Sequence, residues 1–127
     1  MMADYNFLVV EDSPTMRQLI AFSLKRIRNV NIVEAGNGIE ALKKITDSRF
    51  HLMVVDINMP LMDGLKLLSI VRKDPNHKDT PVIIVTTEGA EADREKGIRL
   101  GANAYLTKPI QTNELLKTIK ELLKIQN

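Results

Sequence analysis

The segment LMVVDINMP, residues 52–60, decides the fold class. Its first four residues are apolar, and such a run predicts a strand that is covered on both faces. Asp56 stands where the apolar run stops, and Asn58 and Pro60 follow it. A carboxylate at the end of a strand built for the centre of a protein directs attention to the groups that lie beside it in the sheet.

Five short apolar runs alternate with five helical patterns along the chain. This alternation predicts a doubly wound α/β domain with a parallel sheet, and the preference for right-handed crossovers restricts its topology. We expect the flavodoxin-like strand order 2-1-3-4-5, with five helices, in a single domain over residues 1–127. The five predicted strands are NFLVV (6–10), NIVEA (31–35), LMVVD (52–56), PVIIVT (81–86) and AYLT (104–107).

Polar residues that can cap helices precede four of the helical patterns. The predicted caps are Ser13, Asn37, Asp63 and Thr112. Pro14 directly follows Ser13, and Glu40 stands three residues after Asn37. The fourth helix, near residues 90–100, is different. Its only large apolar residues are Ile98 and Leu100, so we expect few anchoring contacts and a helix that shifts easily.

The composition limits the classes of function. The chain has 127 residues, 44% of them hydrophobic, which suits one domain with its own core. It has no cysteine, which excludes disulfides, thiolate zinc sites and a cysteine nucleophile. The net charge is +2, and basic and acidic residues are mixed along the chain. No apolar run approaches the roughly 20 residues of a membrane span. The start, MMADYNF, lacks the features of a secretory signal. We expect a cytoplasmic protein without a nucleic-acid or membrane partner.

Polar side chains end four of the five predicted strands. Ligands of such sheets bind beyond the carboxyl ends of the strands, where the winding reverses. Strands one and three are neighbours in this order, which brings Asp12 close to Asp56. Two unit charges about 5 Å apart repel by roughly 3 kcal/mol at an effective dielectric near 20. The residues at these strand ends are Glu11 and Asp12 after the first strand, Asp56 at the third, Thr86, Thr87 and Glu88 at the fourth, and Thr107 and Lys108, followed by Pro109, at the fifth.

The excess of negative charge at this edge needs a proton or a divalent cation. Three carboxylates, on Glu11, Asp12 and Asp56, face one cation, Lys108. The available ligands are all oxygens, which suit Mg²⁺ or Mn²⁺ better than Zn²⁺. The two histidines, His51 and His77, lie in other parts of the predicted fold.

Four motifs carry a resemblance to a known family: VVEDSPTMR (9–17), VVDINMPLMDG (54–64), VIIVTTEG (82–89) and GANAYLTKP (101–109). In this order and spacing they closely resemble the receiver domain of response regulators in two-component signalling, and the match covers essentially the whole chain. No output domain follows Asn127, so we expect a stand-alone, CheY-like receiver. The TTEG segment is similar to the chemotaxis branch of the family.

The resemblance implies a role for each residue of the cluster. Asp56 matches the aspartate that accepts a phosphoryl group from the phosphohistidine of a histidine kinase. Asp12 matches a direct Mg²⁺ ligand, Glu11 an acid that acts through water, and the backbone carbonyl of Asn58 would complete the protein's ligands; Mn²⁺ is an alternative ion. Lys108 would pair with the phosphoryl group.

The resemblance also implies a switch. Thr86 would hydrogen-bond the phosphoryl oxygens, and Tyr105 matches an aromatic residue that turns inward when Thr86 moves. The output protein would bind the face formed by the fourth helix, the fifth strand and the fifth helix. Asn58 and Glu88 would flank the path of the attacking water and tune the phosphorylated lifetime.

Three further positions refine the comparison. Glu11 stands where the chemotaxis proteins usually have Asp, and its extra methylene would alter the outer shell of the metal. Ile110 stands where Phe is common, which makes the surface of the output face less similar to theirs. Pro109 would follow a cis peptide bond from Lys108.

Three other functions remain to be weighed. A flavodoxin-like cofactor binder would cradle a phosphate in its first loop, but two carboxylates open that loop here and repel phosphate unless a metal intervenes. A phosphoaspartyl hydrolase would normally place an acid two residues after its nucleophile, where Asn58 stands. A receiver that acts only as a phosphate sink stays open. We expect a monomeric phosphoacceptor with intrinsic autodephosphorylation rather than a turnover enzyme.

Overall fold

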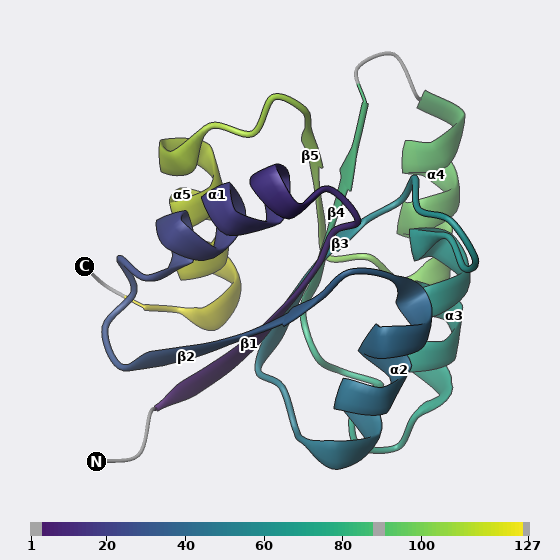
Figure 1. Ribbon diagram of the computed structural model, residues 1–127, viewed down its shortest axis with the longest axis horizontal. Coiled ribbons are helices and arrows are strands. Elements are labelled where there is room, and N and C mark those ends of the chain that lie inside the picture. Colours follow the sequence, from purple (N-terminus) through teal and green to yellow (C-terminus); the bar gives the residue numbers. More distant parts are fainter. Residues whose placement is uncertain (1–3, 88–90, 126–127) are drawn as a thin grey trace.

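The computed structural model describes residues 4–87 and 91–125 of the chain. Its sheet has five parallel strands in the order β2-β1-β3-β4-β5, which confirms the predicted topology (Figure 1). The strands are β1 (Tyr5–Val10), β2 (Val30–Ala35), β3 (Leu52–Asp56), β4 (Val82–Thr86) and β5 (Ala104–Thr107). The helices are α1 (Pro14–Leu24), α2 (Gly38–Asp47), α3 (Gly64–Lys73), α4 (Glu91–Leu100) and α5 (Thr112–Leu123).

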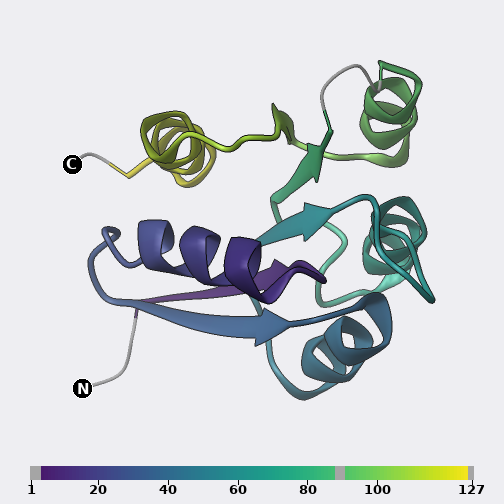
Figure 2. The ribbon, with the colours of Figure 1, turned by 45° about the horizontal axis from the view of Figure 1, so that its top comes forward.

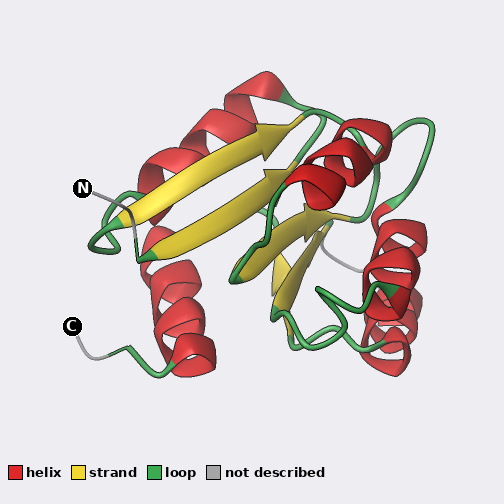
Figure 3. Cartoon of the chain, turned by 90° about the horizontal axis from the view of Figure 1, so that it is seen from below, coloured by secondary structure: helices red, strands yellow, loops and turns green. Residues whose placement is uncertain are grey.

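Helices cover both faces of the sheet, α1 and α5 on one side and α2, α3 and α4 on the other (Figure 2). The helices flank a sheet whose strands fan out with the usual twist (Figure 3). Alternate residues of β1 serve the two layers, because side chains along a strand point to opposite faces. Phe7 and Val9 pack with α1 and α5, while Leu8 and Val10 pack with α2 and α3. The core is mainly aliphatic on both sides, and each layer also buries one phenylalanine, Phe50 with α2 and α3 and Phe7 with α1 and α5.

Three of the four predicted helix caps are confirmed. The side chains of Ser13, Asn37 and Asp63 accept from the backbone N–H groups three residues later, at 3.3, 2.9 and 2.8 Å. The prediction for Thr112 is wrong, because α5 begins at this residue and Gln111 precedes it as the cap without a side-chain hydrogen bond. The hydroxyl oxygen of Thr112 lies 2.9 Å from that of Ser23 on α1 instead, so it ties the two helices together.

Helix α4 packs on the sheet through a glycine rather than through its apolar side chains. Ile98 and Leu100 are 55% and 38% exposed, which agrees with the expectation of few anchoring contacts for this helix. The buried residue of α4 is Gly97, where an added Cβ would collide with the end of the Ile84 side chain. The missing side chain lets the helix backbone approach β4 closely, and the helix has little other burial to hold it.

Within the described part of the chain, none of the helices combines the length and the apolar character that crossing a bilayer requires.

Candidate functional site

The carboxyl ends of β1 and β3 bring three acidic side chains together. One carboxylate oxygen from each of Glu11, Asp12 and Asp56 lies within 4.8 Å of the other two. The register of the sheet explains this, since Val10 of β1 pairs with Val55 of β3 and the acids follow directly. The predicted convergence of Asp12 with Asp56 is therefore confirmed.

Glu11 is the most deeply buried of the three acids. It has no exposed surface, whereas Asp12 is exposed. One carboxylate oxygen, Oε2, accepts from the backbone N–H of Ser13 at 3.1 Å, and the other lies 2.9 Å from Nζ of Lys108. The Glu11 carboxylate is thus held by both the first loop and the end of β5, and its extra length over Asp reaches Lys108.

Asp56 is buried with one oxygen engaged and the other free. It is 2% exposed; Oδ1 accepts from the backbone N–H of Asn58 at 3.3 Å and lies 3.3 Å from Nζ of Lys108. Burial, together with the neighbouring Glu11, raises the pKa of Asp56 from 3.8 to about 7, although Lys108 partly opposes this. The free carboxylate therefore carries an energetic cost that a cation or a phosphoryl group can relieve.

Lys108 spans the two buried carboxylates. Burial alone lowers the pKa of its ammonium group, but the hydrogen bond and charge of Glu11 and the charge of Asp56 outweigh burial and raise it. Lys108 therefore stays charged at neutral pH. The peptide bond that joins it to Pro109 is cis, as the resemblance implies.

Three buried oxygens at this edge have no hydrogen-bond partner among the described residues: Oε1 of Glu11, Oδ2 of Asp56 and Oγ1 of Thr86. Of these, Oε1 of Glu11 forms an ion pair with Lys108, at 2.9 Å from its Nζ. Buried polar atoms are nearly always paired, so unpaired ones point to a missing ligand. Carboxylate and hydroxyl oxygens without nitrogen or sulfur ligands suit a hard cation and phosphoryl oxygens, and the residues present fit Mg²⁺ or Mn²⁺.

The loop between β3 and α3 is shaped to hold Asp56 in place. The backbone N–H of Gly64 donates to the Ile57 carbonyl at 2.9 Å, and an added Cβ on Gly64 would fall on the Asp56 carbonyl. Leu61 in the same loop has φ of 70°, in the left-handed region, and is 83% exposed. The apolar pattern of the sequence gives no sign of either feature.

Arg17 is a site residue that sequence reasoning missed. Its Nη1 donates to the Glu11 carbonyl at 2.9 Å, and its Nε lies 3.2 Å from the Glu34 carboxylate of β2. Arg17 therefore braces the acidic loop against the neighbouring strand. Its place four residues after the Ser13 cap, on the helix face toward β2, is the signal that would have found it.

Thr86 and Tyr105 share one face of the sheet. Tyr105 pairs with Ile84 and Thr86 pairs with Thr107, so the two side chains are diagonal neighbours on adjacent strands. Tyr105 is half-buried, and the guanidinium carbon of Arg94 lies 5.1 Å from the centre of its ring. The structure thus brings both predicted switch residues together.

The remaining predicted site residues lie as follows. The side chain of Asn58 is exposed beside Asp56, and Glu88 lies outside the described residues. His51 accepts from the backbone of Asn6, and buried His77 accepts from the backbone of Phe50, so neither joins the acidic cluster.

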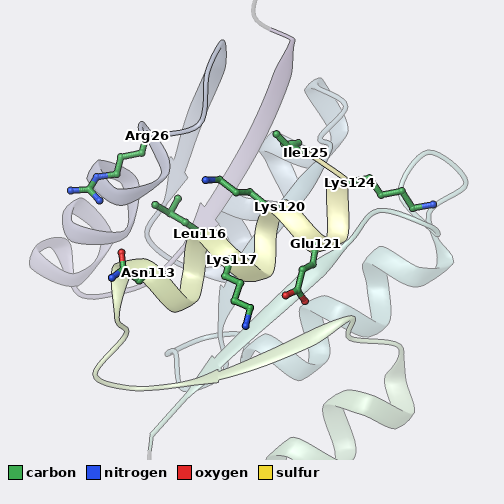
Figure 4. Close-up of a pocket in the computed structure, with 8 residues that line it drawn as sticks. All are labelled: Arg26, Asn113, Leu116, Lys117, Lys120, Glu121, Lys124 and Ile125. Carbon is green, nitrogen blue, oxygen red and sulfur yellow. The ribbon is translucent and has the colours of Figure 1, made fainter. Parts of the chain in front are cut away.

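A hollow of different character lies away from this cluster. It has a volume of about 730 Å³ along α5 and beyond the C-terminal end of α1 (Figure 4). Cations near the C-terminus of a helix are favoured by the helix dipole, which accounts for its basic character. The hollow shares no residue with the acidic site. Its lining residues are Arg26, Asn113, Leu116, Lys117, Lys120, Glu121, Lys124 and Ile125.

Comparison with known proteins gives a consistent result. Residues 7–120 match the family model of the response regulator receiver domain. The chain is 37% identical over 117 residues to a chemotaxis protein CheY homolog of Campylobacter jejuni, covering 91% of this chain and 90% of the relative. It is 38% identical over 117 residues to the chemotaxis protein CheY1 of Helicobacter pylori, covering 91% and 94%.

Solved structures agree with these relatives. The chemotaxis protein CheY4 of Vibrio cholerae superposes with a TM-score of 0.86 at 34% identity, over 96% of this chain and 99% of that chain. The receiver domain of the sensor histidine kinase PA1611 of Pseudomonas aeruginosa has a TM-score of 0.86 at 26% identity, with the same coverage, and its structure holds a magnesium ion in the active site cleft.

Proposed function

This chain belongs to the family of response regulator receiver domains, and from that premise we propose that Asp56 accepts a phosphoryl group from the phosphohistidine of a histidine kinase. The observation that carries the proposal is the buried Asp56 carboxylate, whose Oδ2 has no partner among the described residues while Lys108 lies 3.3 Å from Oδ1. Two-component signal transduction is the setting that the family implies.

The chain's own residues can perform the transfer with little covalent help. A carboxylate oxygen of Asp56 attacks the phosphorus, an O–P bond forms as the N–P bond breaks, and the leaving imidazole keeps the electron pair. No general base is needed once Asp56 is in its carboxylate form, and a cation bound beside it would favour that form over the protonated one. Lys108 and Thr86 supply a cation and a hydroxyl for the phosphoryl oxygens, and such positioning supplies most of the catalysis in phosphoryl transfer.

The acidic cluster supports a dependence on Mg²⁺, with Mn²⁺ as an alternative. Asp12, Asp56 and the backbone carbonyl of Asn58 would hold the ion directly, and Glu11 through water. When bound, the ion would neutralise the cluster and the charge of the incoming phosphoryl group.

The relatives' names and the fold extend the proposal to the output. The chemotaxis proteins among the relatives support a role in chemotaxis. The protein would act in the cytoplasm as a monomeric single receiver domain over residues 1–127. A partner would bind the face of α4, β5 and α5, next to the half-buried Tyr105.

Incubation with acetyl phosphate and Mg²⁺ tests the phosphoacceptor directly. We expect intact-protein mass spectrometry to show a single phosphoryl adduct on the wild type and none on Asp56→Asn. An adduct of normal yield on Asp56→Asn would show that another residue is the acceptor.

Asp12→Ala tests the metal site. We expect loss of both Mg²⁺ binding and the adduct, because Asp12 belongs to the acid cluster, and its exposed position makes a loss of structure on truncation small. Asp47→Ala, which removes an exposed carboxylate from the end of α2, is the control and should behave as the wild type. Normal phosphorylation of Asp12→Ala would make the metal assignment wrong.

A further inference from the structure

We propose that Arg94 is a positioning residue that holds Tyr105 in its resting position and so sets the equilibrium between the resting and switched states. The inference rests on the proposed function, because it concerns the switch that phosphorylation of Asp56 would operate. The contact that carries it joins the Arg94 guanidinium of α4 to the ring of Tyr105 on β5, at 5.1 Å from the ring centre.

The packing of α4 places Arg94 over this ring. Gly97 is the buried residue of the helix and lies against Ile84, the residue that pairs with Tyr105 across the sheet. Arg94 precedes Gly97 by three residues and therefore lies on the same side of the helix. The close approach at Gly97 thus brings the guanidinium within reach of the ring.

Among the described residues, the competing partner of Arg94 forms only a weak ion pair with it. Its Nη1 lies 4.0 Å from the carboxylate of Glu91, one turn earlier, and both side chains are exposed. An exposed ion pair at this limiting distance contributes little to stability. A guanidinium within about 6 Å of a ring centre gains a measurable attraction even at the surface, so the ring is the contact that holds Arg94.

When the Tyr105 ring moves inward, it loses its contact with Arg94. Thr86 is the diagonal neighbour of Tyr105 on the same face, and its buried hydroxyl has no partner among the described residues. Once Thr86 turns toward a phosphoryl group, Tyr105 can move toward β4 and away from the exposed side where Arg94 lies. The Arg94 contact therefore exists only in the resting state, and a contact with one state shifts the balance toward it.

The size of the effect follows from the contact. Cation–π attraction at an exposed site is equivalent to a factor of about two to five in an equilibrium constant. Removing it should make the switched state about two- to fivefold more accessible. A ligand that binds the switched state should then half-saturate at a concentration lower by up to the same factor.

The sequence offers a direct optical test. The chain has two tyrosines and no tryptophan, so Tyr5→Phe leaves Tyr105 as the only tyrosine, and its emission reports on the ring. In this background, Arg94→Gln removes the cation at similar length, and Arg94→Lys restores one. Arg99→Gln is the matched control, because Arg99 lies on the same helix but faces a hollow shared with Leu65 and Lys66 of α3. Each protein is titrated with beryllofluoride, a phosphoryl mimic, at fixed Mg²⁺.

We expect Arg94→Gln to shift the resting emission of Tyr105 toward the beryllofluoride-saturated value and to lower the half-saturating concentration about two- to fivefold. Arg94→Lys should return both quantities most of the way to the wild type, and Arg99→Gln should leave both unchanged. Unchanged emission and half-saturation in Arg94→Gln, or an equal change in Arg99→Gln, would overturn the inference. Failure of the proposed function looks different: the wild type would then form no adduct with acetyl phosphate, and beryllofluoride would leave its Tyr105 emission unchanged, which overturns both.

Discussion

At the scale of single residues, Asp56 is a carboxyl group held where its charge is unfavourable. It is buried, and Glu11 lies beside it; among the described residues, Lys108 is the cation that pairs with both carboxylates. Such an arrangement destabilises the protein when no ligand is bound, and it is the same arrangement that makes the site receptive to a cation and a phosphoryl group. The buried charge of Asp56 thus lowers the stability of the unliganded protein and favours ligand binding at the same carboxylate.

Asp56→Asn should stabilise the protein in EDTA, and increasingly so as the pH rises. The native state raises the pKa of Asp56 from 3.8 to about 7, so the folded protein binds the proton more tightly than the unfolded chain does. Stability contributed by this group is present below about pH 4 and is lost as the pH rises to about 7. The variant lacks this loss, and at pH 8 its free energy of unfolding should exceed that of the wild type by on the order of 1 kcal/mol or more.

Urea unfolding at pH 5 and pH 8, with EDTA or with Mg²⁺, measures this effect. The gain should be larger at pH 8 than at pH 5 and should shrink with Mg²⁺, because a bound cation already relieves the repulsion. Asp47→Asn, at an exposed position, should show no such pattern. A variant that is no more stable than the wild type at pH 8 in EDTA would contradict the electrostatic explanation.

Residue identities predicted the members of the site but not their individual environments. Strand ends and spacing are enough to bring Asp12, Asp56 and Lys108 together, because parallel strands share an edge. They do not show that Glu11 is fully buried while Asp12 is exposed, since burial depends on which side of the first loop meets β5. The left-handed backbone of Leu61 could not be predicted either, because leucine rarely adopts a positive φ.

At the scale of elements, the loop from β3 to α3 holds Asp56, the proposed phosphoacceptor, in position. Gly64 begins α3 directly against the backbone of Asp56 and Ile57, so strand end and helix start are packed without a side chain between them. The motif MDG at residues 62–64 thus has a mechanical reason for its glycine. The strand can hold Asp56 rigidly only while the helix start stays this close.

Gly64→Ala should therefore impair both stability and phosphorylation. The new methyl group would meet the backbone of Asp56, which cannot turn aside as a side chain can. We expect a loss of about 1–3 kcal/mol in the free energy of unfolding and a slower adduct with acetyl phosphate. Gly36→Ala is the control for stability, because its methyl group would meet only the ends of the Glu40 and Arg17 side chains, at 3.2 and 3.3 Å, and these can move. An equal loss of stability in the two variants would show that Gly64 is not a special position.

Elements were predicted well where packing follows periodicity and poorly where it does not. The strands of the structure lie within one residue of the predicted ones, since continuous apolar runs mark them clearly. Helix α4 was expected to be sparsely anchored, which its one buried residue supports, but the anchor is Gly97 rather than Ile98 or Leu100. Hydropathy counts apolar side chains, whereas close approach of a helix to a sheet depends on a missing one.

At the scale of the whole molecule, the two edges of the sheet do different work. The carboxyl ends of the strands carry three acids against one lysine, Lys108, whereas Arg72 connects several loops at the opposite end. There Arg72 of α3 donates to the carbonyls of Thr80 and Gly101 and to the Asn103 side chain, at 2.8 Å each. Topology was predictable because alternation and crossover handedness leave few arrangements. The Arg72 brace was not, because its partners are mostly backbone carbonyls, which carry no sequence signal.

The proposed signal crosses the molecule from Asp56 to the face of α4, β5 and α5, and Thr86 is the residue through which it must pass. The buried hydroxyl of Thr86 can satisfy a phosphoryl oxygen only by moving, and Tyr105 on β5 is its neighbour on the same face. Thr86→Ala should still accept a phosphoryl group, because Asp56, Lys108 and the acidic cluster remain in place. The reaction should be slower, because the Thr86 hydroxyl is lost. The variant should fail to pass the change on to α4 and β5.

Amide chemical shifts of residues 91–110, with and without beryllofluoride, distinguish local binding from a transmitted change. In the wild type we expect shifts that extend along α4 and β5, because α4 has one buried residue to resist displacement. In Thr86→Ala the shifts should stay near Asp56, since alanine has no hydroxyl that could hydrogen-bond the ligand. Residue 86 then stays in place, and Tyr105 keeps its resting position. Wild-type shifts confined to the neighbourhood of Asp56, or shifts of equal reach in the variant, would contradict a path through Thr86 and Tyr105.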